Sequence, residues 1–519
     1  MNRLSTRGRK QWKRVFHRTI VSLWMALLIS TGNIPLAQAD TRTTGLTTPE
    51  EMATFLDAFM PQQMADEHIA GAAVVVVKDG QLFFVKGYGL ANIADQKPVV
   101  AEQTLFRTDS VGKLFVWTAV MQLVEQGQLD LDADINTYLD FQIPATYPAP
   151  ITLKHLMSHS AGFEDLGGAF ALDERELKPV GVWLANNIPA RVRAPGTVSG
   201  YSNYGTALAG YIVERVSGQP FEEYAEEHIF APLGMQHSTF RQPLPENLAV
   251  SASENYQYAD GKFQEKPFMF LHAASMGEGH VTVTDMAKFM VAHLAVDDSP
   301  ILKATTARQM HSQLFRHDPR VSGFAYGFAE TTQNKQRLLR HEGNNPGVSS
   351  TALFLLPDQE IGVYVAYNSN GGFGPGTTLR QAFLDHYYPA LATSPQLVRL
   401  TAEQSNALVG SYRSTRMFHT TYGKIVALAS DNFSDIKVSA NEDGTFTTLG
   451  VGAAPLHWTP IEPQVLRLSN GALNGPGDLI FDIGQNNQAK WLYIGNNPYR
   501  AYEKVAWYET ADFQRAWLV

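Results

Sequence analysis

Ser110 and Lys113 have the residue types and the spacing of a catalytic pair. They open the stretch 110–124, which is mostly apolar and in which Lys113 is the only charged residue. Side chains three positions apart lie on the same face of a helix. Burial disfavours the charged form of a lysine, and a neighbouring amine can act as the base that activates a serine hydroxyl. We therefore expect a buried helix that begins with a nucleophilic serine, where free N–H groups stabilise an oxyanion.

The same pattern has an ordinary alternative, a serine that caps a helix beside a lysine that extends to the surface. The spacing also recurs at Ser434 and Lys437. That second copy lies in an alternating stretch typical of a strand, where residues three apart point to opposite faces. We therefore predict no site at the second copy, and the first needs support from elsewhere in the chain.

Tyr201 and Asn203 provide the first support. They follow a Pro/Gly-containing loop and precede an apolar helix that ends at Gly218. A tyrosine near a lysine can carry protons between a serine and a leaving group. The alternative is an ordinary loop tyrosine that packs its ring.

The segment that begins with His341 and continues through Gly343 and Asn344 provides the second. It follows the predicted strand 336–341, at a position where a strand edge can line a cleft. The alternative is a surface turn that contains a histidine by chance.

Composition excludes several classes of protein. The 519 residues are 44% hydrophobic and 18% charged, which is too apolar for a disordered chain. The absence of cysteine excludes thiol nucleophiles, disulfide scaffolds and Cys-ligated metals. The net charge is −9, and the first 39 residues hold seven basic residues and no acidic one, so the rest is more acidic still. Such a surface argues against nucleic acid as a partner.

The amino terminus has the pattern of a secretory signal peptide. Basic residues precede the apolar run 20–29, and Ala37-Gln38-Ala39 supplies small residues before a cleavage site at Asp40. The apolar run is shorter than the roughly 20 residues that span a bilayer. We expect a secreted or periplasmic protein, with peripheral association with the envelope as a further possibility. The alternative is an uncleaved amino-terminal anchor.

The arrangement of expected elements indicates the fold class. We expect an amphipathic helix, a hairpin, a long helical region and three strands, at residues 50–68, 72–87, 104–300, 336–341, 348–356 and 361–367. Strands at both ends with helices between them favour an α/β (α+β) fold with one antiparallel sheet flanked by helices. Beyond a boundary near residues 393–395, short strands and hairpin turns predict a separate small β-barrel or sandwich at 400–519.

Two patterns that resemble metal sites fail on closer reading. His155 and His159 have the spacing of two zinc ligands on one helix face, but no third ligand is evident. The alternating aspartates of 130–134 begin like a calcium loop, but Ile135 stands where such a loop requires glycine. We predict neither a metal nor a cofactor.

The ordered set Ser110-x-x-Lys113, Tyr201-x-Asn203 and His341-x-Gly343 resembles the serine β-lactamase-like hydrolases. This group includes class C β-lactamases, low-molecular-mass penicillin-binding proteins, D-aminopeptidases and family VIII carboxylesterases. The resemblance covers about residues 50–390, and further matching phrases lie at 78–80, 127–132, 155–162 and 285–290. Together with the signal peptide at 1–39, it implies a serine hydrolase domain at 40–392 and a lipocalin-like or other β-barrel domain at 396–519.

The resemblance also implies roles for the matched residues. Ser110 would be the acylated nucleophile, Lys113 and Tyr201 would share general base and acid duty, and Asn203 would help to position Lys113 and substrate. The backbone N–H groups of Ser110 and Asn344 would form the oxyanion hole.

One departure from the family pattern bears on the substrate. His341 stands where β-lactamases carry the lysine of Lys-Thr-Gly, which anchors the β-lactam carboxylate. We therefore expect small esters or D-amino-acid peptides as substrates rather than β-lactams. The alternatives are a penicillin-binding DD-peptidase or β-lactamase, and a catalytically silent envelope-binding or scaffold protein of the same fold.

Overall fold

The computed structural model describes residues 45–369, 374–390, 394–429, 435–470 and 477–516. The predicted signal peptide and its cleavage site lie outside these residues. Helix α1 (Pro49–Asp66) begins where the Thr48 side chain accepts a hydrogen bond from the Glu51 N–H, and it continues through Pro61. In the described part of the chain, no helix is both long and apolar enough to cross a membrane.

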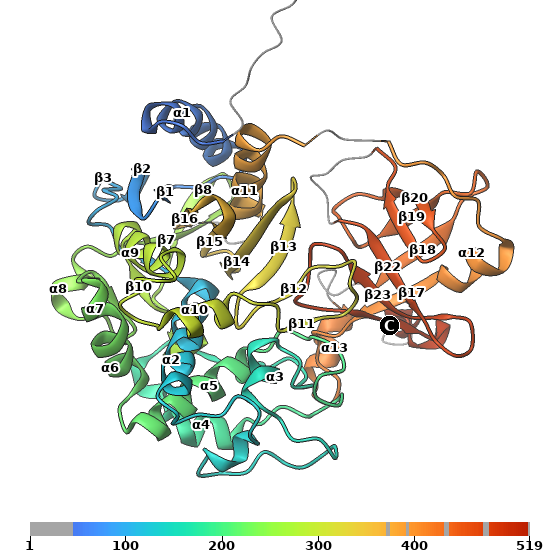
Figure 1. Ribbon diagram of the computed structural model, residues 1–519, viewed down its shortest axis with the longest axis horizontal. Coiled ribbons are helices and arrows are strands. Elements are labelled where there is room, and N and C mark those ends of the chain that lie inside the picture. Colours follow the sequence, from blue (N-terminus) through green and yellow to red (C-terminus); the bar gives the residue numbers. More distant parts are fainter. Residues whose placement is uncertain (1–44, 370–373, 391–393, 430–434, 471–476, 517–519) are drawn as a thin grey trace, which may run out of the picture. The chain divides into compact units, whose positions relative to one another are not determined.

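A nine-stranded antiparallel sheet forms the centre of the larger region (Figure 1). Its order is β11-β12-β13-β14-β15-β16-β1-β2-β3, so the first and last strands of this region, β1 and β16, pair at the middle of the sheet. The strands are β1 (Gly71–Lys78), β2 (Gln81–Asn92), β3 (Lys97–Pro98), β11 (Phe315–Arg316), β12 (Gly323–Phe324), β13 (Ala329–Gln333), β14 (Gln336–Asn345), β15 (Ser349–Leu356) and β16 (Ile361–Tyr367). The predicted antiparallel sheet is therefore confirmed.

Strand β1 shows why the sheet is buried on both faces. Its sequence is apolar up to Lys78, and successive side chains of a strand point to opposite faces. Val75 and Val77 enter the core on one face, whereas Val74 and Val76 enter the core on the other. Helices must therefore cover both sides.

The two faces are covered by different helices. On one face, α1 and α11 (Gly374–Tyr387) contribute Met52, Leu56 and Phe383 to the core. On the other, the core contains residues of α2 (Lys113–Glu125), α5 (Asn203–Ser217) and α9 (Val283–Leu294). The smaller elements are α3 (Leu153–Met157), α4 (Val180–Asn186), α6 (Phe221–Ala225), α7 (Ala231–Leu233), α8 (Glu246–Ala249), α10 (Ala304–Met310), β4 (Phe106–Arg107), β5 (Phe170–Ala171), β6 (Ser238–Thr239), β7 (Asn255–Ala259), β8 (Lys262–Lys266), β9 (Phe270–Leu271) and β10 (His280–Val281).

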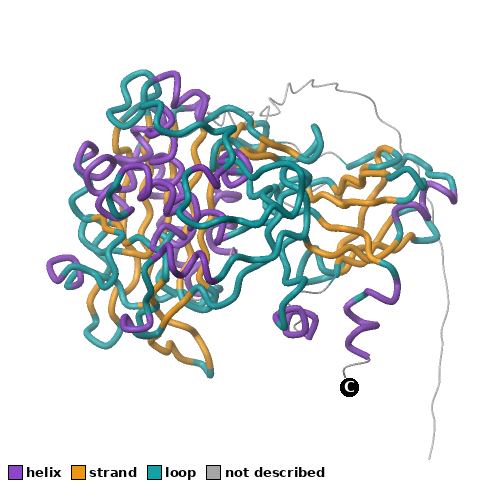
Figure 2. Tube along the Cα trace, turned by 90° about the horizontal axis from the view of Figure 1, so that it is seen from below, coloured by secondary structure: helices purple, strands orange, loops and turns teal. Residues whose placement is uncertain are grey.

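The carboxyl-terminal region is a closed eight-stranded barrel, which decides between the predicted barrel and sandwich (Figure 2). Strand β17 closes it by pairing with both β18 and β24. The strands are β17 (Gly410–Ser414), β18 (Ile436–Ala440), β19 (Phe446–Leu449), β20 (Leu456–Glu462), β21 (Val465–Leu468), β22 (Leu479–Ile483), β23 (Ala489–Ile494) and β24 (Tyr502–Val505). Helix α12 (Ala402–Leu408) precedes the barrel, α13 (Gly423–Ala429) follows β17, and α14 (Ala511–Ala516) follows β24.

The sequence-based prediction for the larger region differs from the structure at two places in the nine-stranded sheet. The strands β11, β12 and β13 were not predicted. Two-residue strands such as β11 and β12 carry almost no alternation, and β13 has five residues that are mostly polar. Strand β14 was predicted to end at His341 but continues to Asn345, paired with β15 as far as Ser349. His341 therefore lies inside a strand rather than at its end.

Candidate active site

Ser110 and Lys113 are adjacent in the structure, with Lys113 Nζ 3.1 Å from Ser110 Oγ. The local geometry differs from the expected continuous helix. Asp109–Gly112 form a 3₁₀ turn, and α2 begins only at Lys113. Side chains at i and i+3 still align in 3₁₀ geometry, so the pair forms all the same.

Lys113 is buried without a counter-ion. Its side chain is 1% exposed, and Nζ also donates to the Met276 carbonyl oxygen. Among the described residues it makes no ion pair with a carboxylate. Nζ is thus held within hydrogen-bond distance of the Ser110 hydroxyl, which is the geometry that a general base requires.

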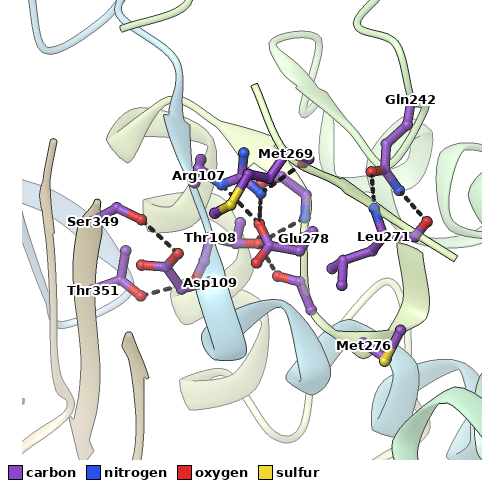
Figure 3. A network of polar contacts seen from close by, with 12 residues as sticks. Arg107, Thr108, Asp109, Gln242, Met269, Leu271, Met276, Glu278, Ser349 and Thr351 are labelled. Carbon is purple, nitrogen blue, oxygen red and sulfur yellow. Dashed lines mark hydrogen bonds and ion pairs between the residues drawn. The ribbon is translucent and has the colours of Figure 1, made fainter. Parts of the chain in front are cut away.

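The backbone just before the nucleophile adopts a costly conformation that the surroundings hold in place (Figure 3). Asp109 has a φ of +46°, which non-glycine residues seldom adopt. Ser349 Oγ donates to Asp109 Oδ1 at 2.7 Å, and Thr351 Oγ1 donates to the Thr108 carbonyl at 2.8 Å. Both partners lie on β15, so the central sheet holds the turn that presents Ser110. Burial raises the pKa of Asp109 to about 7, and the nearby Glu278 carboxylate adds to the effect.

Gly343 brings strand β14 against this turn. A Cβ atom at residue 343 would lie 2.1 Å from Thr351 Oγ1, 2.6 Å from Asp109 Cβ and 2.9 Å from the Ser110 backbone nitrogen. No side chain fits there, so only glycine permits this approach of β14 to the nucleophile. The structure therefore places the predicted Gly343 and Ser110 side by side.

Tyr201 also reaches the pair. Its ring centroid is 5.3 Å from Lys113 Nζ, and its buried hydroxyl has no hydrogen-bond partner among the described residues. The backbone is held by a hydrogen bond of 2.9 Å from the Tyr201 N–H to the Tyr499 carbonyl. A buried hydroxyl without a partner is uncommon in a folded protein, and here it belongs to a ring that lies against the Lys113 amine.

Asn203 is the first residue of α5, which Ser202 caps by accepting from the Gly205 N–H. In the described part of the chain, Lys113 Nζ donates to Ser110 and Met276, and Asn203 is not among its partners. The positioning of Lys113 by Asn203 that the resemblance implies is therefore not seen here. Asn344, the other predicted binding residue, carries a buried and unpaired Oδ1.

His341 is buried and neutral. Its side chain is 1% exposed, and burial, aided by the charge of Lys113, lowers its pKa to about 4. Nδ1 lies 2.9 Å from the Glu342 carbonyl, which can only accept, so the ring proton is on Nδ1. Nε2 is then an acceptor, and it has no partner among the described residues. The alternative of a surface turn is wrong, because the residue lies inside the sheet with its ring 6.4 Å from that of Tyr201.

Three residues near the site were not predicted. His159 stacks on Tyr201 at 4.3 Å between ring centroids, and two residues of the barrel region, Arg416 and Tyr499, also contact Tyr201. His159 belongs to the segment 155–162, which matches the family, but the sequence suggested for it only the role of a zinc ligand. Helix α3 ends at Met157, so His155 and His159 do not share a helix face. No group of three or more acidic or histidine side chains in the described residues is arranged to hold a metal.

Comparisons with known proteins show which proteins the chain is similar to. A family model described as Beta-lactamase matches residues 56–386. Protein flp of Staphylococcus aureus (strain MW2) is 25% identical over 326 residues, which are 62% of this chain and 64% of that protein. Esterase EstB of Burkholderia gladioli is 31% identical over 218 residues, which are 38% of this chain and 54% of that protein. The matched part thus spans less than two thirds of either relative.

A solved structure extends the likeness to the barrel. The octameric penicillin-binding protein homologue from Pyrococcus abyssi superposes with a TM-score of 0.58 and 22% identity, over 87% of this chain and 100% of that one. At this identity the likeness concerns the fold, which includes both the sheet region and part or all of the barrel.

Proposed function

Because the chain belongs to the Beta-lactamase family, we propose that it is a serine hydrolase that cleaves small esters or D-amino-acid amides through an acyl-enzyme on Ser110. The observation that carries the proposal is the buried Lys113 amine, 3.1 Å from Ser110 Oγ and without a carboxylate partner among the described residues. An unpaired amine held against a hydroxyl is the arrangement that general-base activation needs.

The proposed reaction has two stages. Lys113 accepts the proton of Ser110 as Oγ attacks the substrate carbonyl, and the backbone N–H groups of Ser110 and Asn344 stabilise the oxyanion. Tyr201 then donates a proton to the leaving oxygen or nitrogen, which departs as the alcohol or amine. In the second stage, water attacks the acyl-enzyme carbonyl and gives a proton to the Tyr201 oxygen, and Lys113 returns its proton to Ser110 Oγ. The acyl group leaves as a carboxylic acid and the enzyme is restored.

The neutral state of His341 supports esters and D-amino-acid amides over β-lactams. A ring with a pKa of about 4 carries no charge at neutral pH and cannot anchor a carboxylate as a lysine does. The similarity to a protein named as an esterase favours esters.

Labelling of the purified protein with a fluorophosphonate probe, followed by peptide mass spectrometry, tests the nucleophile. We expect label on Ser110 and turnover of p-nitrophenyl acetate or butyrate, with both lost in Ser110→Ala. The matched control is Ser434→Ala, which alters the second Ser-x-x-Lys copy. Label elsewhere, or turnover that survives in Ser110→Ala, would exclude this mechanism, whereas the absence of both label and turnover in the wild-type protein would favour the silent scaffold.

Export is a second part of the proposal. The basic residues, the apolar run and the small residues before Asp40 support a signal peptide. Amino-terminal sequencing of the protein from the cell envelope or medium should find Asp40 as the first residue. A protein that retains Met1 there is anchored rather than cleaved.

A further inference from the structure

The barrel region places a second cation beside the catalytic tyrosine. Arg416 follows strand β17, and its guanidinium carbon lies 4.9 Å from the centroid of the Tyr201 ring. Lys113 Nζ lies 5.3 Å from the same centroid. The ring of Tyr201 thus contacts both Lys113, the proposed base, and a positively charged residue of the barrel region.

Arg416 is held in place by polar contacts between the two regions. Its Nε donates to Asp165 Oδ2 at 3.1 Å, and the Asp165 N–H donates to the Met417 carbonyl at 3.0 Å. The neighbouring Glu164 carboxylate accepts from the backbone N–H groups of His419 and Thr420. The loop that carries Arg416 is therefore tied to residues 164–165 by both backbone and side chains.

The terminal nitrogens of Arg416 are open. Nη1 and Nη2 form no hydrogen bond with any described residue, and the side chain is 25% exposed. A guanidinium that is fixed at Nε and open at both Nη atoms can still bind a carboxylate through two parallel hydrogen bonds.

The other cations near the site are already engaged. Arg340 and Arg380 both form ion pairs with the buried Glu342 carboxylate. His341, which lies next to Glu342, is neutral. Lys113 is committed to Ser110 and the Met276 carbonyl. Arg416 is itself paired with Asp165 through Nε, but of the two cations found against the Tyr201 ring it is the one whose terminal nitrogens make no hydrogen bond with a described residue.

We propose that Arg416 binds a carboxylate on the leaving group of the substrate. This inference rests on the proposed serine hydrolase function and names its substrate class: esters and amides whose departing alcohol or amine carries an acid, as in a peptide with a free carboxyl terminus. The leaving-group side follows because Arg416 lies against Tyr201, the residue that protonates the leaving atom. The cation missing at His341 is thus supplied by the barrel region.

A matched pair of esters tests this directly. In 3-acetoxybenzoate the leaving phenol carries a carboxylate, and in 3-acetoxybenzamide it carries a neutral amide of similar size. We expect the wild-type protein to prefer the acid. Arg416→Gln should lower kcat/KM for the acid about 10- to 100-fold, mainly through KM, and change the amide by less than about twofold. Arg416→Lys should keep part of the preference, because a lysine keeps the positive charge but cannot form two parallel hydrogen bonds with a carboxylate.

Arg320→Gln is the matched control. Arg320 forms an ion pair of 3.4 Å with Glu462 across the same interface and is not one of the cations found against the Tyr201 ring. The variant removes one positive charge from the same interface, so the ratio of acid to amide turnover should remain that of the wild type. An equal loss for both esters in Arg416→Gln would overturn the proposal, because it would show that Arg416 only positions Tyr201. An absence of acid preference in the wild type would also overturn it.

Binding of the product separates this inference from the proposed function. Calorimetry should show that 3-hydroxybenzoate binds the full-length wild-type protein more tightly than 3-hydroxybenzamide, and that Arg416→Gln abolishes the difference. Equal binding of 3-hydroxybenzoate to both proteins refutes the role of Arg416 even where turnover depends on Ser110. Turnover that survives in Ser110→Ala refutes the proposed hydrolase mechanism, and the binding result then still decides the carboxylate site.

Discussion

The sheet region and the barrel region bury different kinds of residue. The core of the barrel is apolar and aromatic, with Tyr412, Trp458 and Phe481 at its centre. The sheet region buries ionisable groups beside its apolar core, among them Lys113 and His341. Apolar burial stabilises a fold but supplies no reactive group, whereas desolvated ionisable groups cost stability and make chemistry possible. The difference favours the sheet region as the place of the proposed catalytic groups.

The two regions nevertheless share one site. The barrel contributes through loops rather than through its core: one loop carries Arg416 and another carries Tyr499. A small apolar cluster that includes Val198 and Val321 of the sheet region and Trp491 and Tyr493 of the barrel packs between them. The barrel is therefore part of the candidate active site, although its own interior has no role in catalysis.

The largest expected effect is a difference in kcat/KM between variants of the two lysines that occur in Ser-x-x-Lys patterns, Lys113 and Lys437. Lys113→Met should reduce kcat/KM for p-nitrophenyl acetate about a thousandfold, because the base for Ser110 is removed. Lys437→Met, in strand β18 of the barrel, removes an ion pair with Asp512 at the surface and should leave the rate unchanged. Steady-state kinetics on both variants measure the contrast, and similar rates for the two would contradict it.

A core substitution in the barrel should affect stability rather than chemistry. Trp458 is fully buried, and its indole N–H donates to Thr448 Oγ1 at 2.8 Å. Trp458→Ala should lower the free energy of unfolding by about 3–5 kcal/mol, as truncation of a large buried aromatic does. Urea titration measures the loss, and kcat measured at low temperature should stay near the wild-type value. A large fall in kcat for the folded variant would show that the barrel core does more than support its loops.

The close approach of β14 to the nucleophile can be tested by the addition of a single carbon atom at residue 343. Gly343→Ala adds a Cβ that would lie 2.9 Å from the Ser110 nitrogen and closer still to Thr351 Oγ1. We expect the turn to shift and kcat to fall about 10- to 100-fold, because displacement of about 1 Å is enough to lose that much. Gly444→Ala, at a barrel turn with open space around the glycine, is the comparison for kcat. Equal kcat in the two variants would contradict the close approach.

The smallest expected effect is a pH dependence of stability that arises in the sheet region. Burial lowers the pKa of both His311 and His341 to about 4, below the value of about 6.5 for an unfolded histidine. Between these values the unfolded state binds more protons, so stability should fall as pH is lowered from 6.5 toward 4, by on the order of 1 kcal/mol for each histidine. Urea titrations at pH 7 and pH 5 measure the change. His311→Gln should reduce it, and an undiminished dependence would assign the effect to other groups.

Local signals in the sequence predicted the parts of the fold that depend on neighbouring residues. The hairpin of β1 and β2 was expected from its alternation and the turn at Asp79-Gly80, and α5 ends where Gly218 adopts a left-handed conformation. The antiparallel sheet followed from the order of strands and helices. The length of β14 was missed, because pairing with β15 rather than local sequence determines where it ends.

The sequence by itself determined the pairing of Ser110 with Lys113 and the family to which the chain belongs. Three residues of separation bring two side chains together in any helical turn, so that contact needs no tertiary information. The tertiary structure decided the rest of the site: Gly343 against Ser110, and Tyr499 and Arg416 against Tyr201. These contacts join residues more than 200 positions apart in the chain. The position of β14 in the sheet brings Gly343 to Ser110, and the packing of the barrel loops on the sheet region brings Tyr499 and Arg416 to Tyr201. No local pattern encodes either arrangement.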